Sequence, residues 1–487
     1  MSPDSLKNKT INGVVWSFLD TAGSLGITFI VGIILARLLS PEDYGLVGIV
    51  FIFTTIAFNI IDGGFSNAII RKKDATEQDY STMFYTNLVI SLLLALTLFL
   101  YSSGIANFFH RKELIPLTKA LSPILVLNGL SFVQRTVLTK QINFKTQTII
   151  SIASSLISGV VGIAIAFWGY GVWALVWQQL SRQLVNTVLL WILSRWKPLL
   201  QFSITSFKEL FGFGWKLLLS NLLDSIWKQL NNVVIGRVYS PQTLGYYTRA
   251  EQYGSIFSST LTTVMQRVSF PVLSSIQDDK SRLKSAYRSL IKIIMCITTL
   301  LMFGLAADAK SIIIILIGEK WQNSIPLLQL LCFSMFMYPL HSLNLNMLQV
   351  AGRSDLYLKL EIVKKILAIV PVILGIFVDI YFMLYGMIII NIISFFLNAH
   401  YSGTMINYSS VDQLKDILPS LAISLFVALP MWLLSFLNIS VYVVFAMQFL
   451  VGTTVAVSLH EIFKLSEYIE IKQILKQNIV KFIKRKK

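Results

Sequence analysis

Apolar segments long enough to cross a bilayer recur from one end of the chain to the other. Each has roughly 20 residues or more, which is the length that a helix needs to span the hydrocarbon core. Polar residues gather in the short stretches between them. We predict a transmembrane helix in each of 14 segments: 13–36, 46–70, 82–103, 115–138, 147–168, 172–193, 213–236, 246–276, 286–307, 324–350, 357–378, 381–401, 417–437 and 441–460.

A polar motif between these segments occurs twice. ARLLSPEDYG at residues 36–45 recurs as GRVYSPQTLG at residues 236–245. We expect the proline of each copy to end the preceding helix and the glycine four residues later to ease the turn into the next segment. Six segments separate the copies, so both halves enter the membrane from the same side. The repeat predicts an all-α integral membrane protein with two six-helix lobes in parallel orientation, a plan used by alternating-access transporters, plus two extra helices.

The predicted organisation follows from this repeat. It comprises an N-terminal lobe at residues 1–196, a cytoplasmic linker at 197–212, a second lobe at 213–404, two further helices within 405–460 and a tail at 461–487. The tail is basic, and its apolar positions recur at helical spacing: Ile462, Leu465, Ile469, Leu475, Ile479 and Phe482. We therefore expect an amphipathic helix on the anionic surface of the inner leaflet.

Charge sets the orientation of the helices. With the N-terminus in the cytoplasm, the inner connections hold 17 Lys and Arg residues and the outer connections hold six, before the tail is counted. Positive residues near membrane segments favour the cytoplasmic side. Both termini are therefore expected in the cytoplasm, with both Ser-Pro motifs on the outer side.

Composition supports the membrane class and narrows the chemistry. Only 13% of the 487 residues are charged and the mean hydropathy is +0.69, whereas soluble proteins average about 25% charged residues. The net charge of +17 is explained by membrane electrostatics, and no nucleic-acid partner is expected. The two cysteines and four histidines fit neither a disulfide scaffold nor a metal-ligand spacing. We expect no metal site and no catalytic residue.

Polar residues inside segment 213–236 follow one helical face. Asn221, Asp224, Lys228 and Asn231 recur at helical spacing. An ionisable side chain at the centre of a transmembrane helix costs roughly 2.5–3.5 kcal/mol on insertion scales. A structural alternative is that these groups hold helices together, and Asp224 and Lys228 could neutralise each other.

Three further segments carry similar stripes. Segment 13–36 contains Asp20, segment 46–70 contains Asn59 and Asp62, and segment 246–276 contains Arg249 and Arg267. Polar stripes that faced lipid would leave several groups without partners. The four stripes together predict a water-filled cavity between the two lobes.

Distributed stretches of the sequence resemble a known family. ARLLSPEDYGLVGIV, GGFSNAIIRKKDATEQD, INFKTQ with WGYGVWALVWQQL, SFPVLSSIQDDKSRLKSAYR and MFMYPLHSLNLNMLQVAGRSDLYLKLE are similar to the polysaccharide-transporter branch of the multidrug/oligosaccharidyl-lipid/polysaccharide exporter superfamily. The nearest likeness is to Wzx-type flippases of O-antigen units and related exporters. It covers residues 5 to about 410.

The resemblance implies a flippase in the bacterial inner membrane. Such proteins move an undecaprenyl-pyrophosphate-linked oligosaccharide to the outer leaflet, and a polysaccharide polymerase is a further expected partner. Cationic cavity residues are thought to bind the pyrophosphate in this family. In this sequence that role would fall to Lys228, Arg267, Arg249, Lys216 and Arg37.

The sequence favours an ion gradient as the energy source for transport. No phosphate-binding loop of the GxxxxGK[ST] type is present and no connection could house a nucleotide-binding domain, so we expect no cofactor. The carboxylates Asp20, Asp62 and Asp224, together with Asn59, Asn221 and Asn231, are candidates for H⁺ or Na⁺ coupling.

Three alternatives stay open. An organic-cation or multidrug antiporter has the same two-lobed plan, but its cavity should be net acidic. A flippase of the peptidoglycan precursor lipid II belongs to the same functional class. A membrane glycosyltransferase or polymer ligase needs an acidic catalytic motif and a large outer loop, and neither stands out here.

Overall fold

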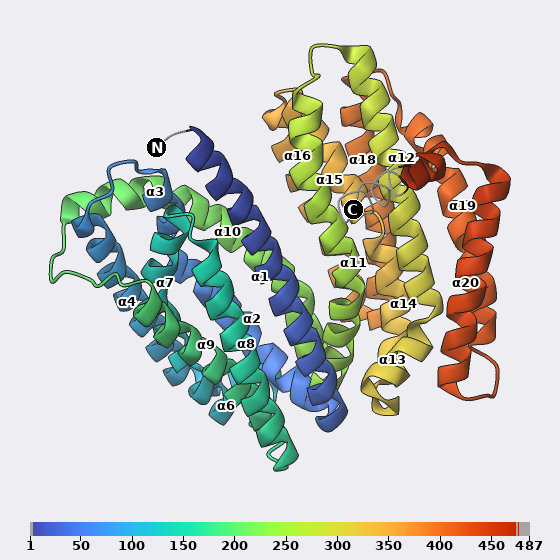
Figure 1. The fold of residues 1–487 in the computed structure, drawn as a ribbon. Helices are drawn as coiled ribbons and strands as arrows, with labels where there is room; N and C mark the ends of the chain where they lie inside the picture. The colour runs from blue at the N-terminus through green and yellow to red at the C-terminus, as the bar shows by residue number, and fades with distance from the viewer. Residues whose placement is uncertain (1–2, 474–475, 477–487) are drawn as a thin grey trace, which may run out of the picture. The chain divides into compact units, whose positions relative to one another are not determined.

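A computed structural model describes residues 3–473 and residue 476, and every regular element within them is a helix (Figure 1). By its internal contacts the chain divides into two compact units, Met1–Gly245 and Tyr246–Lys487. The helical fold class is confirmed, whereas the division into lobes at the predicted boundaries stays a prediction.

Within its described residues, from Pro3 onward, the first unit contains ten helices and the start of an eleventh. They are α1 (Pro3–Leu38), α2 (Pro41–Asp62), α3 (Phe65–Arg71), α4 (Glu77–Leu100), α5 (Ser102–Phe109), α6 (Leu114–Leu121), α7 (Pro123–Lys140), α8 (Phe144–Phe167), α9 (Trp173–Leu193), α10 (Ile204–Val238) and the first turn of α11 (Pro241–Ser274).

The second unit contains the rest of α11 and the remaining helices. These are α12 (Lys280–Ala307), α13 (Ala309–Ile317), the short 3-10 helix η1 (Glu319–Trp321), α14 (Ser324–Met335), α15 (Tyr338–Val350), α16 (Ser354–Leu367), α17 (Ile369–Phe377), α18 (Ile380–Thr404), α19 (Ser410–Leu434) and α20 (Val441–Phe463). Residues 466–473 form a further helical segment after α20.

Every predicted span coincides with helical structure, but four spans consist of two helices each. Segment 46–70 is divided at Gly63 and Gly64, which lie in the left-handed region with φ of 57° and 71°. Glycine adopts this conformation without the steric cost that a Cβ would impose. Segments 115–138, 324–350 and 357–378 are divided near Ser122, Phe336 and Ala368. Helices α5 and α13 were not predicted.

Ten spans within the described residues are both long and apolar enough to cross a membrane. The predicted spans missing from these ten coincide with α9, α10, α11 and the α16–α17 pair. Helices α10 and α11 have 35 and 34 residues, which is ample length, but they carry two of the polar stripes. Their low hydropathy is what a helix that lines water should show. The count of 14 stays a prediction.

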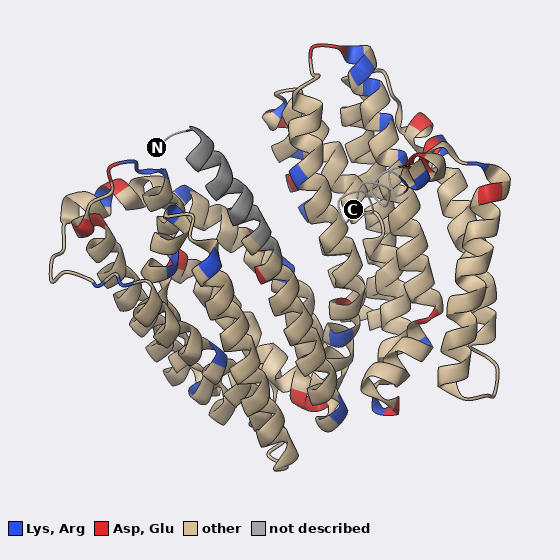
Figure 2. Cartoon of the chain, viewed as in Figure 1, with Lys and Arg blue, Asp and Glu red and all other residues tan. Residues whose placement is uncertain are grey.

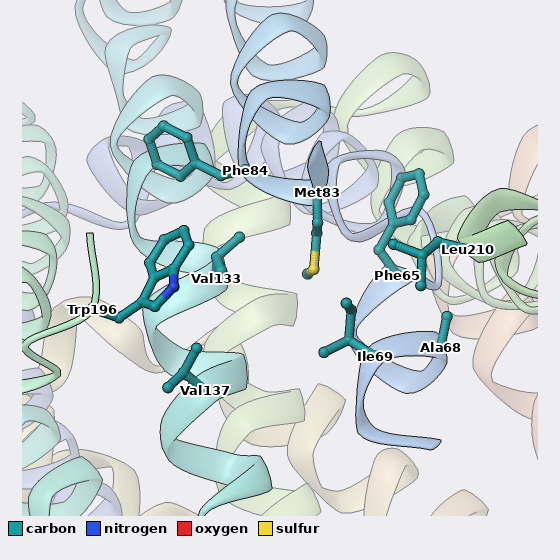
Figure 3. Packing of buried hydrophobic residues seen from close by; sticks show 9 residues of the cluster. All are labelled: Phe65, Ala68, Ile69, Met83, Phe84, Val133, Val137, Trp196 and Leu210. Carbon is teal, nitrogen blue, oxygen red and sulfur yellow. The ribbon is translucent and has the colours of Figure 1, made fainter. Parts of the chain in front are cut away.

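The hydrophobic core of the first unit gathers side chains from four helices and from the connection that follows α9 (Figure 3). Met83 and Phe84 of α4 meet Val133 and Val137 of α7, with Trp196 closing one side. Residues from α3 and α10 complete the cluster: Phe65, Ala68, Ile69 and Leu210. Helix α10, which was predicted to open the second lobe, thus packs against α2 and α3 of the first unit.

Charged residues are concentrated near the helix ends of each unit, with long uncharged stretches between (Figure 2). Polar caps fix several of these ends. Ser40 and Asp43 form a reciprocal capping box at the start of α2, with Pro41 in the first helical position. Helix α1 ends at Leu38, just before this proline, as expected, and Pro41 itself begins α2. The role predicted for the glycine was wrong, because Gly45 lies inside α2, where its missing side chain lets the backbone of Pro241 come close.

The predicted tail lies only partly within the described residues. Residues 466–473 are helical, whereas Leu475, Ile479 and Phe482 lie outside the described part. Leu465 packs against a small cluster that contains Ile423 and Ala456. The amphipathic tail as a whole stays a prediction.

Candidate functional site: the polar faces of α1, α2, α10 and α11

The polar stripe of α10 lies on an exposed face. Asn221, Asp224 and Lys228 are exposed, whereas Ser225, one residue beyond Asp224, is buried on the side that faces α2. Asn231 continues the stripe and is half-buried. The helical spacing in the sequence therefore does place three polar groups, one of them cationic, on one open side of a helix.

Lys228 is a cation without a recorded partner among the described residues. The expected alternative, mutual neutralisation by an ion pair with Asp224, is therefore not seen. An unpaired ammonium within an apolar helix is costly unless water or an anionic ligand reaches it. Its position on an exposed face permits both.

Asn59 holds α2 to α10. Its side-chain nitrogen donates to the hydroxyl of Ser225 at 3.1 Å and to the carbonyl oxygen of Thr55 at 3.0 Å. Both bonds are internal to the first unit. For Asn59 the structure therefore supports the alternative that the sequence left open, a polar group that joins two helices.

Asp62 is the last residue of α2, next to the two left-handed glycines. Its carboxylate accepts hydrogen bonds from the backbone and the side chain of Ser66, which lies in the first turn of α3. Ser66 in turn shares a hydrogen bond with Thr136 of α7 at 2.9 Å. One oxygen of the aspartate, Oδ1, is buried without a protein partner.

Asp20 lies where α1 packs against α8. Ser24 donates to its Oδ1 at 3.4 Å, and the Ser24 hydroxyl is also 2.8 Å from that of Ser151. Asp20 and Arg182 both act electrostatically on Arg135 of α7, and Arg135 donates to the side-chain oxygen of Asn186 at 3.1 Å. The first unit thus gathers one carboxylate and two guanidinium groups on α1, α7 and α9.

The remaining cations of the predicted set lie apart from one another. Lys216 is exposed on α10 beside the ring of Trp215, and Arg37 is exposed in the last turn of α1. Lys216 and Lys228 are 12 residues apart on one helix, which corresponds to about 18 Å at 1.5 Å per residue. The two lysines cannot hold the same phosphate in this conformation.

Helix α11 carries the two predicted arginines of the second unit. Arg249 is half-buried and donates to the side-chain oxygen of Gln252 at 2.5 Å, whereas Arg267 is exposed and has no recorded partner in the described part of the chain. They are 18 residues apart, or about 27 Å along the helix. Of the two, Arg267 is the better placed to receive a ligand.

Several polar contacts were not foreseen from the sequence. Lys140 donates to the carbonyl oxygens of Ile69 and Lys72, which end α3. Lys72 also bridges Asp79 at 3.0 Å and Glu209 at 2.8 Å, and the bond to Glu209 raises its pKa. Apart from the bridge to Asp79, these contacts join residues more than 60 positions apart, so no local pattern in the sequence predicts them.

The comparisons place the chain among proteins of cell-surface polysaccharide synthesis. A family model described as "Polysaccharide biosynthesis protein" matches residues 34–326. The teichuronic acid biosynthesis protein TuaB of Bacillus subtilis is 28% identical, over 72% of this chain and 73% of its own length. The lipopolysaccharide biosynthesis protein WzxC of Escherichia coli is 26% identical, over 76% of each chain.

Solved structures show the same fold. The lipid II flippase MurJ in an inward closed conformation has a TM-score of 0.70 at 19% identity, covering 92% of this chain and 98% of that one. A multidrug resistance MATE transporter of the MOP superfamily, inward-facing, has a TM-score of 0.60 at 15% identity, covering 81% and 98%. The predicted resemblance to the polysaccharide-transporter branch is confirmed.

Proposed function

Because this chain belongs to the family of polysaccharide biosynthesis proteins, we propose that it is a flippase and not an enzyme. Its substrate is an oligosaccharide repeat unit, of O-antigen or exopolysaccharide type, linked through pyrophosphate to undecaprenol. It moves the unit from the inner to the outer leaflet by alternating access. Relatives that are named for polysaccharide synthesis, TuaB and WzxC, support this substrate class.

The exposed polar stripe of α10 is the observation that carries the proposal. An anionic diphosphate with a hydrated glycan cannot cross hydrocarbon unaided, since each polar group needs a partner once water is lost. Lys228 offers such a partner, with Asn221 and Asp224 on the same exposed face. The substrate's polyprenyl tail stays in lipid while the head group follows the polar face.

Lys228 and Arg267 are the proposed contacts for the pyrophosphate. Both are exposed and have no recorded protein partner among the described residues. An arginine donates paired hydrogen bonds to phosphate oxygens, and a lysine supplies a movable point charge. Lys216 lies about 18 Å from Lys228 along α10, and Arg249 lies about 27 Å from Arg267 along α11. Lys216, Arg249 and Arg37 would act at other stages of transport.

Ion coupling belongs to the same proposal. Asp20, Asp62 and Asp224 are carboxylates within predicted spans, and a proton or Na⁺ moving through them could draw on about 2.3 kcal/mol per charge per 100 mV of membrane potential. The unpartnered Oδ1 of Asp62 supports that residue as a place where an ion can bind.

The chain is a multi-span membrane protein of the type found in the bacterial inner membrane. We propose that both termini lie in the cytoplasm, because of the asymmetry of Lys and Arg residues. A polysaccharide polymerase is the partner that would consume the flipped unit, since a repeat unit in the outer leaflet has to be joined to others.

The test is a deletion strain that is complemented with variants. Deletion should abolish surface polymer and leave lipid-linked units in the inner leaflet, and Lys228→Ala or Arg267→Ala should reproduce that loss. Lys208→Ala is the matched control, because Lys208 is an exposed lysine in the first turn of the same α10. Full surface polymer from both site variants, at normal protein level, would contradict the assigned contacts.

Transport assays in liposomes separate the alternatives. A lipid-linked oligosaccharide should be flipped, and flipping should respond to a proton or Na⁺ gradient. A MATE-type carrier would instead move an organic cation, and a MurJ-type carrier would prefer lipid II. Since the likeness to both solved structures shows the fold alone, only the substrate can decide, and transport of either rival in place of the oligosaccharide would overturn the proposal.

A further inference from the structure

A polar cavity of about 320 Å³ lies between α12 and the helical segment at residues 466–473. Four charged residues line it. Arg288 and Lys292 come from α12, and Glu467 and Glu470 come from the C-terminal segment. The volume is within the range of small-molecule sites, and the family function described above uses none of these residues.

The cavity lies at the polar ends of three long apolar helices, α12, α19 and α20. The uncharged apolar stretch of α12 begins at Ile293, that of α19 begins at Ile417, and that of α20 ends at Leu459. The α12 residues that line the cavity, from Ser285 to Lys292, lie just before that stretch. Lysine and arginine side chains at such a boundary reach the head-group layer. A phospholipid of the leaflet on this side can therefore present its head group to the cavity.

The cations and the carboxylates of the cavity face one another without pairing. Arg288 and Lys292 both interact with Asp416 of α19, at 2.5 Å and 3.5 Å. Within the described residues, no ion pair joins either cation to Glu467 or Glu470. Two cations share one carboxylate, so the α12 side of the cavity keeps a net positive charge.

The opposite wall carries the two carboxylate side chains. Glu467 is 3% exposed, and its two oxygens accept from the hydroxyls of Ser420 at 2.9 Å and Ser466 at 3.0 Å. Glu470 accepts from Ser289 at 2.9 Å. Hydroxyl donors fix both carboxylates in place without neutralising them. The cavity is thus dipolar, with opposite charges on opposite walls.

We propose that this cavity binds the zwitterionic head group of phosphatidylethanolamine. The phosphate lies on the α12 wall near Arg288 and Lys292, and the primary ammonium lies on the carboxylate wall near Glu470. Both charges of the ligand meet opposite charges, and the ammonium has three N–H donors for the carboxylates. Phosphatidylcholine lacks those donors, and phosphatidylglycerol lacks the cation.

Lipid retention by the purified full-length protein tests the proposal. Native mass spectrometry would count bound phosphatidylethanolamine, phosphatidylcholine and phosphatidylglycerol, each added at equal concentration, with soluble phosphoethanolamine as a competitor. The native protein should retain phosphatidylethanolamine best. Glu470→Gln should lower its retention by about tenfold, the effect of losing one hydrogen bond to a charged group, and leave phosphatidylglycerol unchanged.

Two more variants keep the result interpretable. Lys292→Gln should lower retention of both phosphatidylethanolamine and phosphatidylglycerol, because it acts on the phosphate. Arg282→Gln removes an exposed cation from the same helix but outside the cavity, and should change nothing. Thermal melting of each variant identifies any that fails to fold, and Glu470 is exposed, so its variant is expected to fold.

Three results would overturn the proposal. These are equal retention of all three lipids by the native protein, a preference that survives the double variant Glu470→Gln with Lys292→Gln, or a preference for phosphatidylglycerol. If soluble phosphoethanolamine competes with the lipid, the head group alone is recognised; if it does not compete, the lipid tails are needed as well. In both cases a lipid preference that depends on Glu470 supports the site, and a preference that does not depend on Glu470 contradicts it. Because flipping is not measured, failure here leaves the proposed function untouched.

Discussion

A Cβ atom on Gly45 would lie 1.6 Å from the carbonyl oxygen of Pro241, a distance that no side chain can occupy. The contact is reciprocal, since a Cβ on Gly245 would lie 1.9 Å from the carbonyl oxygen of Pro41. The two copies of the Ser-Pro motif therefore cross at their glycines. The repeated glycine serves close helix packing, as small residues do between membrane helices.

Substituting Gly45 by alanine should destabilise the first unit. The added methyl group meets backbone and not a flexible side chain, so we expect a loss of at least about 1–3 kcal/mol, as for overpacked cores. Thermal melting in detergent measures it. Gly304→Ala is the control, because a Cβ there meets nothing within 4 Å and the residue lies inside α12. That variant should be neutral or slightly stabilised, and equal melting of the two variants would contradict the packing role.

Substitution of Asn59 should lower stability, whereas substitution of Lys228 should lower transport. Asn59→Leu removes the hydrogen bond to Ser225 and should cost about 0.6 kcal/mol of stability, the average for such bonds between membrane helices, with transport largely retained. Lys228→Gln should leave melting unchanged and lower transport about tenfold or more. Lys228→Arg should retain activity. Melting and flipping assays on the same preparations would reveal the opposite outcome, in which Asn59 controls transport.

Asp416 should be a strong determinant of stability in the second unit. Its side chain is 8% exposed and accepts two hydrogen bonds from Arg288, at 2.5 and 2.6 Å, and one from Tyr408 at 2.6 Å. Breaking a buried pair costs about 3–5 kcal/mol, and since Arg288 is half-exposed we expect roughly 2 kcal/mol for Asp416→Asn.

The matched comparison for Asp416 is the exposed pair Arg353–Asp355, at 2.7 Å. Solvent screens that pair, so Asp355→Asn should not change the melting temperature. A similar loss from both substitutions would show that burial does not set the strength of the Asp416 contact.

Asp308 should make stability depend on pH. The residue lies between α12 and α13, is 8% exposed, and has one oxygen without a partner. Burial raises the pKa of its carboxyl from 3.8 to about 7. The folded protein then binds a proton that the unfolded chain releases between pH 4 and pH 7, so stability falls as the pH rises through this window, by up to about 4 kcal/mol.

The Asp308→Asn variant isolates this effect. An amide does not titrate, so the melting temperature of the variant should fall less between pH 5 and pH 7 than that of the native protein. The two curves should run parallel above about pH 8, where the carboxyl is ionised in both states. Identical pH profiles would contradict the assignment.

The sequence was informative wherever a local period decided the outcome. Every apolar run coincides with helical structure, and the spacing of Asn221, Asp224 and Lys228 placed them on one exposed face, which the structure confirms. Similarity to relatives identified the family. The spacing does not show which of these polar groups are hydrogen-bonded to other parts of the protein. Asn59 and Asp62 lie in a polar stripe like that of Lys228, but Asn59 is hydrogen-bonded to Ser225 and Asp62 interacts with Ser66.

The sequence alone determined that this chain is a helical membrane protein with an internal repeat and polar helical faces, because these properties depend on residue type and on a period of 3.6. Tertiary structure decided what the repeat and the polar groups do. The role of each such residue depends on which segments meet in space. Gly45 packs against Pro241 instead of easing a turn, and Lys140 binds the end of a distant helix instead of remaining unpaired. The physical reason is that hydrogen bonds and steric contacts act over a few ångströms, whereas their partners lie tens to hundreds of residues apart.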